Sequence, residues 1–148
     1  MPTKNKLSRL VKETAGFSYE FIRHPKKMGS VIPSSRMLAR AMRRTAQDYG
    51  APDSIIIEAG AGTGAITREL VAHFPAERLL INELNPRLAR RLRDRFPHNT
   101  VRRGGVEALD VWTQPAPKTI VSSLPFRSLP QEIAHSIESL FFTALREN

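Results

Sequence analysis

Two acids and three glycines stand at positions from which they could bind a small charged molecule. Glu58 lies just before a turn that contains Gly60, Gly62 and Gly64, and Glu83 follows the first of these glycines by 23 residues. Glycine lets a backbone approach a ligand closely. Nucleotide-binding α/β sheets place an acid at about this distance to accept hydrogen bonds from ribose hydroxyls. The spacing therefore predicts a nucleoside-bearing cofactor.

The identity of this cofactor depends on Glu58. The turn also satisfies the dinucleotide fingerprint, Gly60-x-Gly62-x-x-Ala65, so a nicotinamide cofactor and an oxidoreductase are one alternative. A carboxylate buried beside the turn would repel a pyrophosphate and would be costly without a partner. S-adenosylmethionine carries a sulfonium cation and an ammonium group but no phosphate. We therefore expect S-adenosylmethionine, with Glu58 and Glu83 as anchors.

Alternating strands and helices must position these residues. The β-branched run from Ile55 to Ile57 indicates a buried strand, and a helical pattern follows the glycines directly. Strands are expected near 54–59, 78–83, 99–103 and 118–123, and helices near 63–74, 86–96 and 130–146. Ser34 or Ser35 is the expected N-cap of an earlier helix that runs to about Tyr49. This alternation predicts an α/β fold with a mainly parallel sheet.

The composition excludes several classes of function. The chain has no cysteine, so thiol catalysis, disulfides and cysteine-ligated zinc are excluded. Its four histidines are scattered without metal-ligand spacing, and we expect no metal site. No apolar run reaches the length of a membrane span, and the N-terminus lacks the apolar core of a signal peptide. The sequence predicts a soluble protein.

The net charge of +9 is concentrated in the first third of the chain. Residues 1–44 contain eleven Lys and Arg against two acids, whereas the remaining residues contain equal numbers of bases and acids. We therefore divide the chain into a basic arm with a connector, residues 1–50, and a cofactor-binding domain, residues 51–148, which is close to neutral. Such asymmetry indicates an anionic partner, either a membrane surface or a nucleic acid.

The arm has the pattern of an amphipathic helix. Leu7, Leu10, Phe17 and Phe21 fall on one side of a helical wheel, and most of the charged residues fall opposite. Basic charge opposite Leu and Phe is typical of a helix lying among lipid headgroups. A helix that caps the domain core is the alternative. We expect residues 4–23 to bind an anionic membrane.

Four motifs together resemble those of a known enzyme family. They are Pro25-x-x-x-Gly29-x-x-x-Pro33-Ser34-Ser35-x-x-Leu38-Ala39, the turn from Glu58 to Gly64, Glu83-x-Asn85, and Val121-Ser122-Ser123-Leu124-Pro125-Phe126-Arg127-Ser128-Leu129-Pro130. In these motifs the chain resembles class I S-adenosylmethionine-dependent methyltransferases, and more narrowly the bacterial phospholipid N-methyltransferases. The resemblance implies a Rossmann-like sheet and a cytoplasmic, peripherally membrane-associated enzyme that N-methylates a phospholipid amine such as that of phosphatidylethanolamine. The expected cofactor-binding residues are Glu58, Gly60, Ala61, Gly62, Gly64, Glu83, Leu84, Val106 and Ser123.

Two positions depart from the patterns of related families. The rRNA adenine dimethyltransferases, which are similar, have an Asn-Leu-Pro-aromatic motif that binds the target adenine, and Ser123 stands in the place of that asparagine. RNA methylation is therefore the alternative function rather than the first. Many family members also have an acid where this chain has Gly105, to hold the adenine amino group of the cofactor. Either Glu107 substitutes for this acid from the next turn, or cofactor affinity is lower.

The catalytic residues are less well defined. Methyl transfer requires an unprotonated amine held in line with the carbon–sulfur bond, so positioning supplies most of the catalysis. Phe126 is expected to form an aromatic wall for a methylated ammonium, although a core role is the alternative. Tyr19, His24 and His135 are candidates for a general base. None of them is preferred, and the base stays unknown.

The sequence ends after the helix that follows the fourth strand, whereas a complete fold of this class continues with further strands. We therefore expect a shortened member or fragment that lacks the C-terminal strands. Its fourth strand would be an exposed edge, through which we expect poor solubility or oligomerisation. A cofactor-binding module without turnover is a further alternative.

Overall fold

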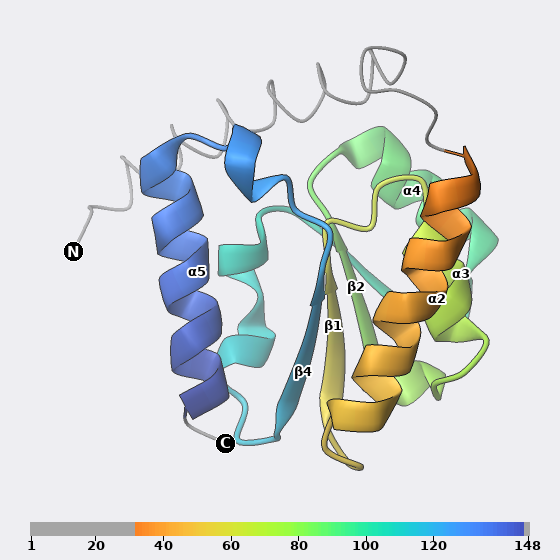
Figure 1. Ribbon diagram of the computed structural model, residues 1–148, viewed down its shortest axis with the longest axis horizontal. Helices are drawn as coiled ribbons and strands as arrows, with labels where there is room; N and C mark the ends of the chain where they lie inside the picture. The colour runs from red at the N-terminus through yellow and green to blue at the C-terminus, as the bar shows by residue number, and fades with distance from the viewer. Residues whose placement is uncertain (1–31, 147–148) are drawn as a thin grey trace.

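A computed structural model describes residues 32–146, and the predicted arm at residues 4–23 lies outside this range. The described chain forms one parallel sheet with helices on both faces (Figure 1). The strands are β1 (Ile55–Ala59), β2 (Leu79–Glu83), β3 (Thr100–Arg103) and β4 (Lys118–Ser122). The α-helices are α2 (Ile32–Tyr49), α3 (Ala65–Val71), α4 (Pro86–Arg95) and α5 (Gln131–Arg146). Short 3-10 helices are η2 (Ala76–Arg78), η3 (Val106–Ala108), η4 (Asp110–Thr113) and η5 (Phe126–Ser128).

The strand order β3-β2-β1-β4 places β1 and β2 at the centre of the sheet. All three strand pairs are parallel, and Glu58 of β1 is in register with Ile81 of β2 and Val121 of β4. All five residues of β2 are buried, as expected for a parallel strand covered on both faces. These features confirm the predicted Rossmann-like α/β fold. Within the described residues β4 is an edge strand, as the sequence predicted.

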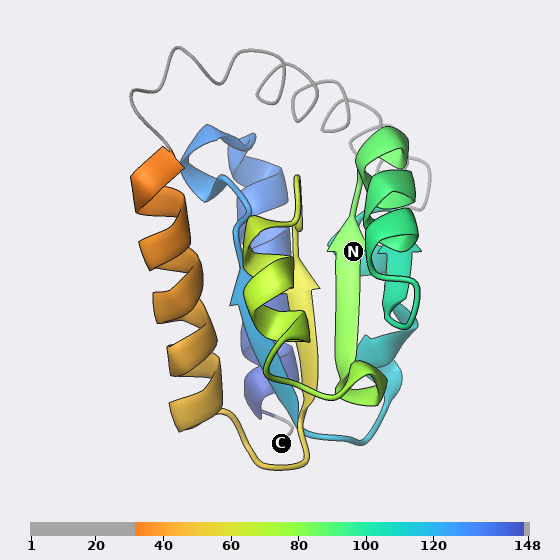
Figure 2. The same cartoon turned by 90° about the vertical axis from the view of Figure 1, so that its right-hand side faces the viewer.

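Helices cover both faces of the sheet (Figures 1 and 2), and a hydrophobic core lies on each face. One lies beneath α2, α3 and α4, and the other lies beneath α5 and the short helices η3 and η4. The alternation of side chains along β1 explains the division, because Ile56 belongs to the first core and Ile57 to the second. Both isoleucines are almost completely buried, so β1 is fixed on its two faces.

Helix α2 starts at a different residue from the one that the sequence predicted. Helix α2 begins at Ile32, so Ser34 and Ser35 lie inside it and neither is the N-cap. Pro33 is compatible with this start, because a proline in the first turn lacks only an N–H that would have no helical partner. Ala39 and Ala46 of α2 belong to the first core. The expected domain boundary near residue 50 stays a prediction, although α2 packs on the same core as the sheet.

The helices that follow β1 and β2 begin at features visible in the sequence. Helix α4 starts at Pro86, and the Asn85 side chain accepts hydrogen bonds from the backbone N–H groups of Arg87 and Leu88 at 2.9 and 3.2 Å. Helix α3 is shorter than the predicted 63–74, because the left-handed Gly64 delays its start until Ala65. No helix among residues 32–146 is long and apolar enough to span a membrane.

Candidate cofactor-binding site

The glycine turn is fastened to the carboxyl end of β2. The backbone N–H groups of Gly60 and Ala61 both donate to the Asn82 carbonyl, at 3.1 and 3.0 Å. Gly60, Gly62 and Gly64 have φ angles of 80°, 58° and 86°, in the left-handed region that favours glycine. A Cβ at Gly60 would lie 2.8 Å from a Leu124 methyl group, whereas a Cβ at Gly62 would meet nothing within 4 Å. The turn is therefore packed at its base and open at Gly62.

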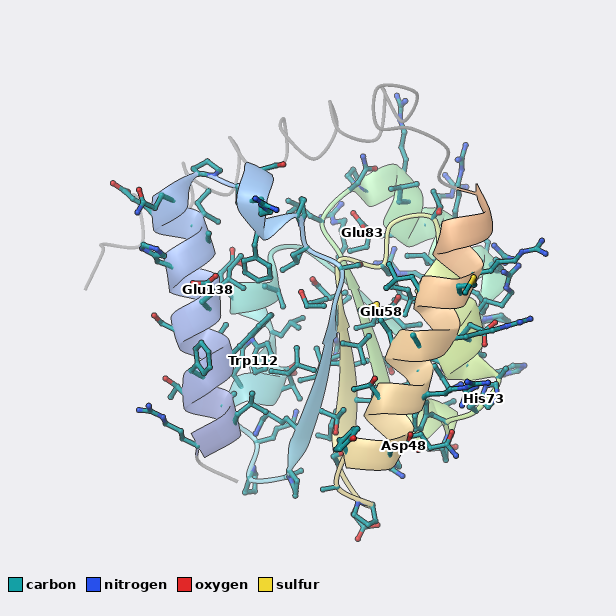
Figure 3. All side chains as sticks on the ribbon, viewed as in Figure 1. Asp48, Glu58, His73, Glu83, Trp112 and Glu138 are labelled. Carbon is teal, nitrogen blue, oxygen red and sulfur yellow. The ribbon has the colours of Figure 1, made fainter. Side chains whose placement is uncertain are left out.

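Glu83 closes the turn against the start of α4. One of its carboxylate oxygens accepts the backbone N–H of Gly62, and the other accepts that of Asn85, both at 2.7 Å. The side chain is almost buried although it is acidic. It lies at the same end of the sheet as the turn (Figure 3). Each carboxylate oxygen can accept more than one hydrogen bond, so Glu83 can position the turn and still contact a ligand hydroxyl.

Glu58 lies below the turn and is completely buried. Neither of its carboxylate oxygens has a hydrogen-bond partner among the described residues. Burial raises the pKa of this carboxyl group from 4.5 to about 7. The side chain and backbone of Thr67 lie close enough to lower this pKa by a smaller amount, although neither forms a hydrogen bond of good geometry with Glu58, and the negative charge of Glu83 adds a minor increase. Because an unpaired buried carboxylate is costly, a cation that reached it would be bound favourably.

Asn82 is a site residue that the sequence analysis missed. Its carbonyl accepts both N–H groups of the turn, and its side-chain amide donates to the Gly104 carbonyl at 3.0 Å. Asn82 is buried, and its carbonyl and side-chain amide together join the loops that follow β1 and β3. The available signal was a polar residue inside an otherwise apolar strand, directly before Glu83.

The loop after β4 is attached to the same turn. Ser123 donates its hydroxyl hydrogen to the Gly60 carbonyl, and its backbone N–H donates to the Ala59 carbonyl at 3.0 Å. This hydroxyl group therefore contacts the glycine turn in the described structure. Leu84, which follows Glu83, is half-buried at the mouth of the site.

Glu107 occupies the space that a side chain at Gly105 would fill. A Cβ built on Gly105 would have the Glu107 carboxyl carbon and both carboxylate oxygens within 2.5 Å. An acidic group is thus present at this position of the loop, supplied by the next turn of the chain. This position of Glu107 is compatible with the first of the two alternatives from the sequence, in which Glu107 substitutes for the acid missing at Gly105.

The remaining predicted residues lie at the margins of the site. Val106 is buried in the second core, and its carbonyl accepts the Trp112 indole N–H at 2.7 Å. Phe126 is half-buried and packs edge to face on Phe141, with ring centroids 6.3 Å apart and planes at 76°. His135 is exposed on α5, and the other two candidates for a base lie outside the described range. No potential metal-ligand cluster of three His, Asp or Glu side chains occurs among residues 32–146.

The described groups suit a cationic nucleoside better than a pyrophosphate. Three carboxyl groups, those of Glu58, Glu83 and Glu107, lie around a turn that is open at Gly62. Helix α3 begins directly after the turn but has only seven residues. These carboxyl groups, when ionised, would repel the negative charges of a phosphate. The arrangement supports the expected S-adenosylmethionine chemistry over nicotinamide binding.

Comparison with known proteins identifies two relatives. The ornithine lipid N-methyltransferase of Singulisphaera acidiphila is 32% identical over 137 residues, which covers 82% of this chain and 66% of that protein. The ribosomal RNA small subunit methyltransferase A of Chlorobium phaeobacteroides is 32% identical over 123 residues, which covers 83% of this chain and 42% of that protein. No protein-family profile matches the chain.

Both relatives are methyltransferases, and the parallel sheet carries the glycine turn and the strand-end acid of their class. The chain belongs to the class I methyltransferase family. It spans just under two thirds of the first relative and less than half of the second.

Proposed function

We propose that the chain is an S-adenosylmethionine-dependent methyltransferase that N-methylates the amine headgroup of a membrane lipid, a phospholipid such as phosphatidylethanolamine being the expected substrate. The observation that carries the cofactor assignment is Glu58, a completely buried acid whose carboxylate oxygens have no partner among the described residues. A ligand with an ammonium and a sulfonium group supplies the missing positive charge. A dinucleotide does not.

Each acid has a separate role in this proposal. Glu83 accepts hydrogen bonds from the ribose hydroxyls, Glu58 compensates the positive charge, and Glu107 holds the adenine amino group. The glycine turn provides close backbone approach at Gly62. When bound, S-adenosylmethionine supplies an electrophilic methyl group on its sulfonium. The protein contributes binding, orientation and exclusion of water.

Two observations favour a lipid over RNA. The first relative acts, by its name, on an ornithine lipid, and the match covers more of that relative than of the ribosomal RNA methyltransferase. Ser123, at the position where RNA-modifying relatives have an asparagine, donates its hydroxyl hydrogen to the Gly60 carbonyl. It provides no amide to recognise an adenine. RNA adenine methylation is the second candidate, supported by the similarity to the ribosomal RNA enzyme.

The body of the protein also has an uneven charge. Residues 86–103, which include α4 and β3, contain seven arginines and one acid, although the cofactor-binding domain as a whole is close to neutral. Arg87, Arg90 and Arg91 are exposed and make no ion pair with any described residue. Arginine binds phosphate groups through its planar fork of donors. This surface supports the proposed contact with an anionic membrane, in addition to the arm at residues 4–23.

Phe126 is proposed to form one wall of the amine site. An alkylamine has a pKa of about 10.4 and must lose a proton before it attacks, so an apolar aromatic surface assists by removing water. After each transfer the methylated ammonium is attracted to the ring face. Phe126→Leu keeps an apolar contact with Phe141 but removes this attraction. We expect it to lower kcat/KM several-fold while S-adenosylhomocysteine affinity is unchanged.

A labelling experiment tests the substrate. The chain is incubated with methyl-labelled S-adenosylmethionine and separately with phosphatidylethanolamine vesicles, ornithine lipid vesicles and RNA. We expect label in a lipid pool. Label in RNA alone would replace the lipid proposal with the second candidate, and no label in any pool together with normal S-adenosylhomocysteine binding would indicate a module without turnover.

A second experiment tests the membrane contact separately. Retention on anionic vesicles is measured for two double variants. Leu10→Ser with Phe17→Ser alters the apolar side of the predicted helix, and Lys4→Ser with Lys6→Ser removes basic charge. Insertion of an amphipathic helix requires both sides, so both variants should bind less. If the apolar double variant binds as well as the native chain, residues 4–23 do not insert into the membrane. RNA binding, in contrast, should depend mainly on the lysines.

A further inference from the structure

The segments that follow the four strands carry few charges. They are residues 60–64, 84–85, 104–109 and 123–130, and together they contain one acid, Glu107, and one base, Arg127. All four strands are parallel, so these segments meet at the end of the sheet where the glycine turn lies. Arg103 ends β3, but β3 lies at the opposite edge of the sheet from β4. Arg127 is therefore the one cationic side chain that these segments bring to the site.

Arg127 is held on a fixed turn of the chain. It is the middle residue of η5, in which the Ser128 N–H donates to the Pro125 carbonyl at 2.8 Å. Phe126 and Leu129, on either side of it, pack in the second core. Side chains three residues apart in a 3-10 helix lie on the same side, so Arg127 projects away from this core. Arg127 is accordingly exposed.

The segment that carries Arg127 is attached to the cofactor site. It follows β4 at the same end of the sheet as the glycine turn (Figure 1), and the Ser123 hydroxyl donates to the Gly60 carbonyl. Phe126, the proposed wall of the amine site, packs edge to face on Phe141. Consecutive Cα atoms are about 3.8 Å apart, so a single headgroup can contact both Phe126 and the residue that follows it.

The Arg127 guanidinium has the chemistry of an anion site. It makes no ion pair with any described residue. Its planar fork of N–H donors matches the oxygens of a phosphate or a carboxylate. The acids around the glycine turn, when ionised, repel such an anion. An anionic group that enters the site together with an amine is therefore most favourably placed beside Arg127.

We propose that Arg127 binds the anionic group of a zwitterionic lipid headgroup while Phe126 contacts the amine that is methylated. This inference rests on the proposed function, whose substrate it specifies. The substrate carries an amine and, in the same headgroup, a phosphate diester or a carboxylate. Phosphatidylethanolamine has the phosphate, and an ornithine lipid has the carboxylate. Arg127 is a binding residue in this proposal and takes no part in the methyl transfer itself.

Three lipids test the inference. They are phosphatidylethanolamine, an ornithine lipid, and a dialkyl lipid whose aminoethyl group is attached through an ether instead of a phosphate diester. Each is diluted in micelles of non-ionic detergent, so that no anionic surface attracts the rest of the chain. Transfer of label from S-adenosylmethionine is measured for the native chain, Arg127→Gln and Arg127→Lys. Arg68→Gln is the matched control, because Arg68 is exposed on α3, on the opposite face of the sheet from η5.

Arg127→Gln should lower kcat/KM about tenfold for one or both zwitterionic lipids and leave the ether lipid unchanged, because only the former lose a charged hydrogen bond. The lipid that is affected identifies the anion as phosphate or carboxylate. Arg127→Lys should retain part of the activity, since it keeps the charge but not the fork. Arg68→Gln should behave as the native chain. S-adenosylhomocysteine affinity should be the same in all variants, and thermal melting verifies that each is folded.

A binding measurement separates this inference from the proposed activity. Dihexanoyl forms of the two zwitterionic lipids, used as monomers below their critical micelle concentrations, are titrated by calorimetry in the presence of S-adenosylhomocysteine. Arg127→Gln should weaken this binding about tenfold. If the native chain binds a zwitterionic lipid through Arg127 but methylates none of the three, the inference holds and the proposed activity fails.

Four results would overturn the inference. An equal loss of activity on all three lipids would mean that Arg127 supports only the fold of its loop. A loss of S-adenosylhomocysteine affinity in Arg127→Gln would mean that Arg127 binds the carboxylate of the cofactor. Unchanged activity and lipid binding in Arg127→Gln would mean that no anionic group contacts it. No binding of either short-chain lipid by the native chain would mean that the site does not take a zwitterionic headgroup.

Discussion

The Glu83 carboxylate accepts the backbone N–H of Gly62 and that of Asn85, both at 2.7 Å, and so joins the glycine turn to the start of α4. These are charge-assisted hydrogen bonds to an almost buried side chain. The turn is therefore fixed before any ligand arrives, and a preformed site lowers the entropic cost of binding.

Replacing Glu83 should weaken both the fold and the site. Glu83→Gln can keep one accepted hydrogen bond, but its amide nitrogen would face the other N–H donor. A hydrogen bond to a charged group contributes about 1.5–3 kcal/mol, so we expect unfolding free energy to fall by about that amount. S-adenosylhomocysteine affinity should fall at least several-fold, measured by titration calorimetry. Glu77→Gln, an exposed acid outside the site, is the control and should change neither quantity.

Glu58 should make stability depend on pH. Its pKa is about 7 in the folded protein and 4.5 ordinarily, so the folded state binds the proton more tightly. This tighter proton binding stabilises the folded state fully below about pH 4.5, and the stabilisation is lost as the pH rises through 7. The difference between the two pKa values corresponds to about 3 kcal/mol of unfolding free energy. Glu58→Gln should abolish this slope in urea unfolding followed by Trp112 fluorescence. An unchanged slope would show that Glu58 does not titrate in this range.

The same titration should be visible in ligand binding. A bound ammonium favours the carboxylate form of Glu58, so S-adenosylhomocysteine affinity should increase between pH 6 and 8 in the native chain. Glu58→Gln should bind weakly at all these pH values. It should nevertheless be more stable than the native chain at pH 8, where the native residue is an unpaired buried charge. Loss of both stability and affinity would indicate a purely structural role.

The sequence predicted the sheet well because its strands depend on local patterns. Runs such as Ile55 to Ile57 are apolar on both faces, and Asn85-Pro86 is a helix start that needs no distant partner. The role of Asn82 was not predictable in this way. Its carbonyl and amide contact two loops that are distant in sequence, and these contacts depend on the register of β1, β2 and β3. The start of α2 was missed because a serine favours an N-cap but does not require one.

Gly60 and Gly62 should respond differently to the same substitution. Gly62→Ala places a methyl group in open space at φ 58°, so it should cost about 1–2 kcal/mol of stability from backbone strain alone. It should also reduce S-adenosylhomocysteine affinity, because the methyl group projects where the ligand approaches. Gly60→Ala adds a contact 2.8 Å from Leu124 and should lower the melting temperature further. If the two variants lost affinity and stability to the same extent, the ligand would not approach the turn at Gly62.

An acidic side chain at position 105 should be able to replace the one at position 107. The Glu107 carboxylate fills the space of a side chain at Gly105, so Gly105→Asp alone would force the two acids together and should weaken binding and stability. Glu107→Ala should weaken S-adenosylhomocysteine binding, because it removes the acid that we propose to hold the adenine amino group. The double variant Gly105→Asp with Glu107→Ala should recover most of that loss, because the acid returns from the other position. Calorimetric titration of the four proteins gives the coupling energy, and additive effects would mean that Glu107 does not replace the missing acid.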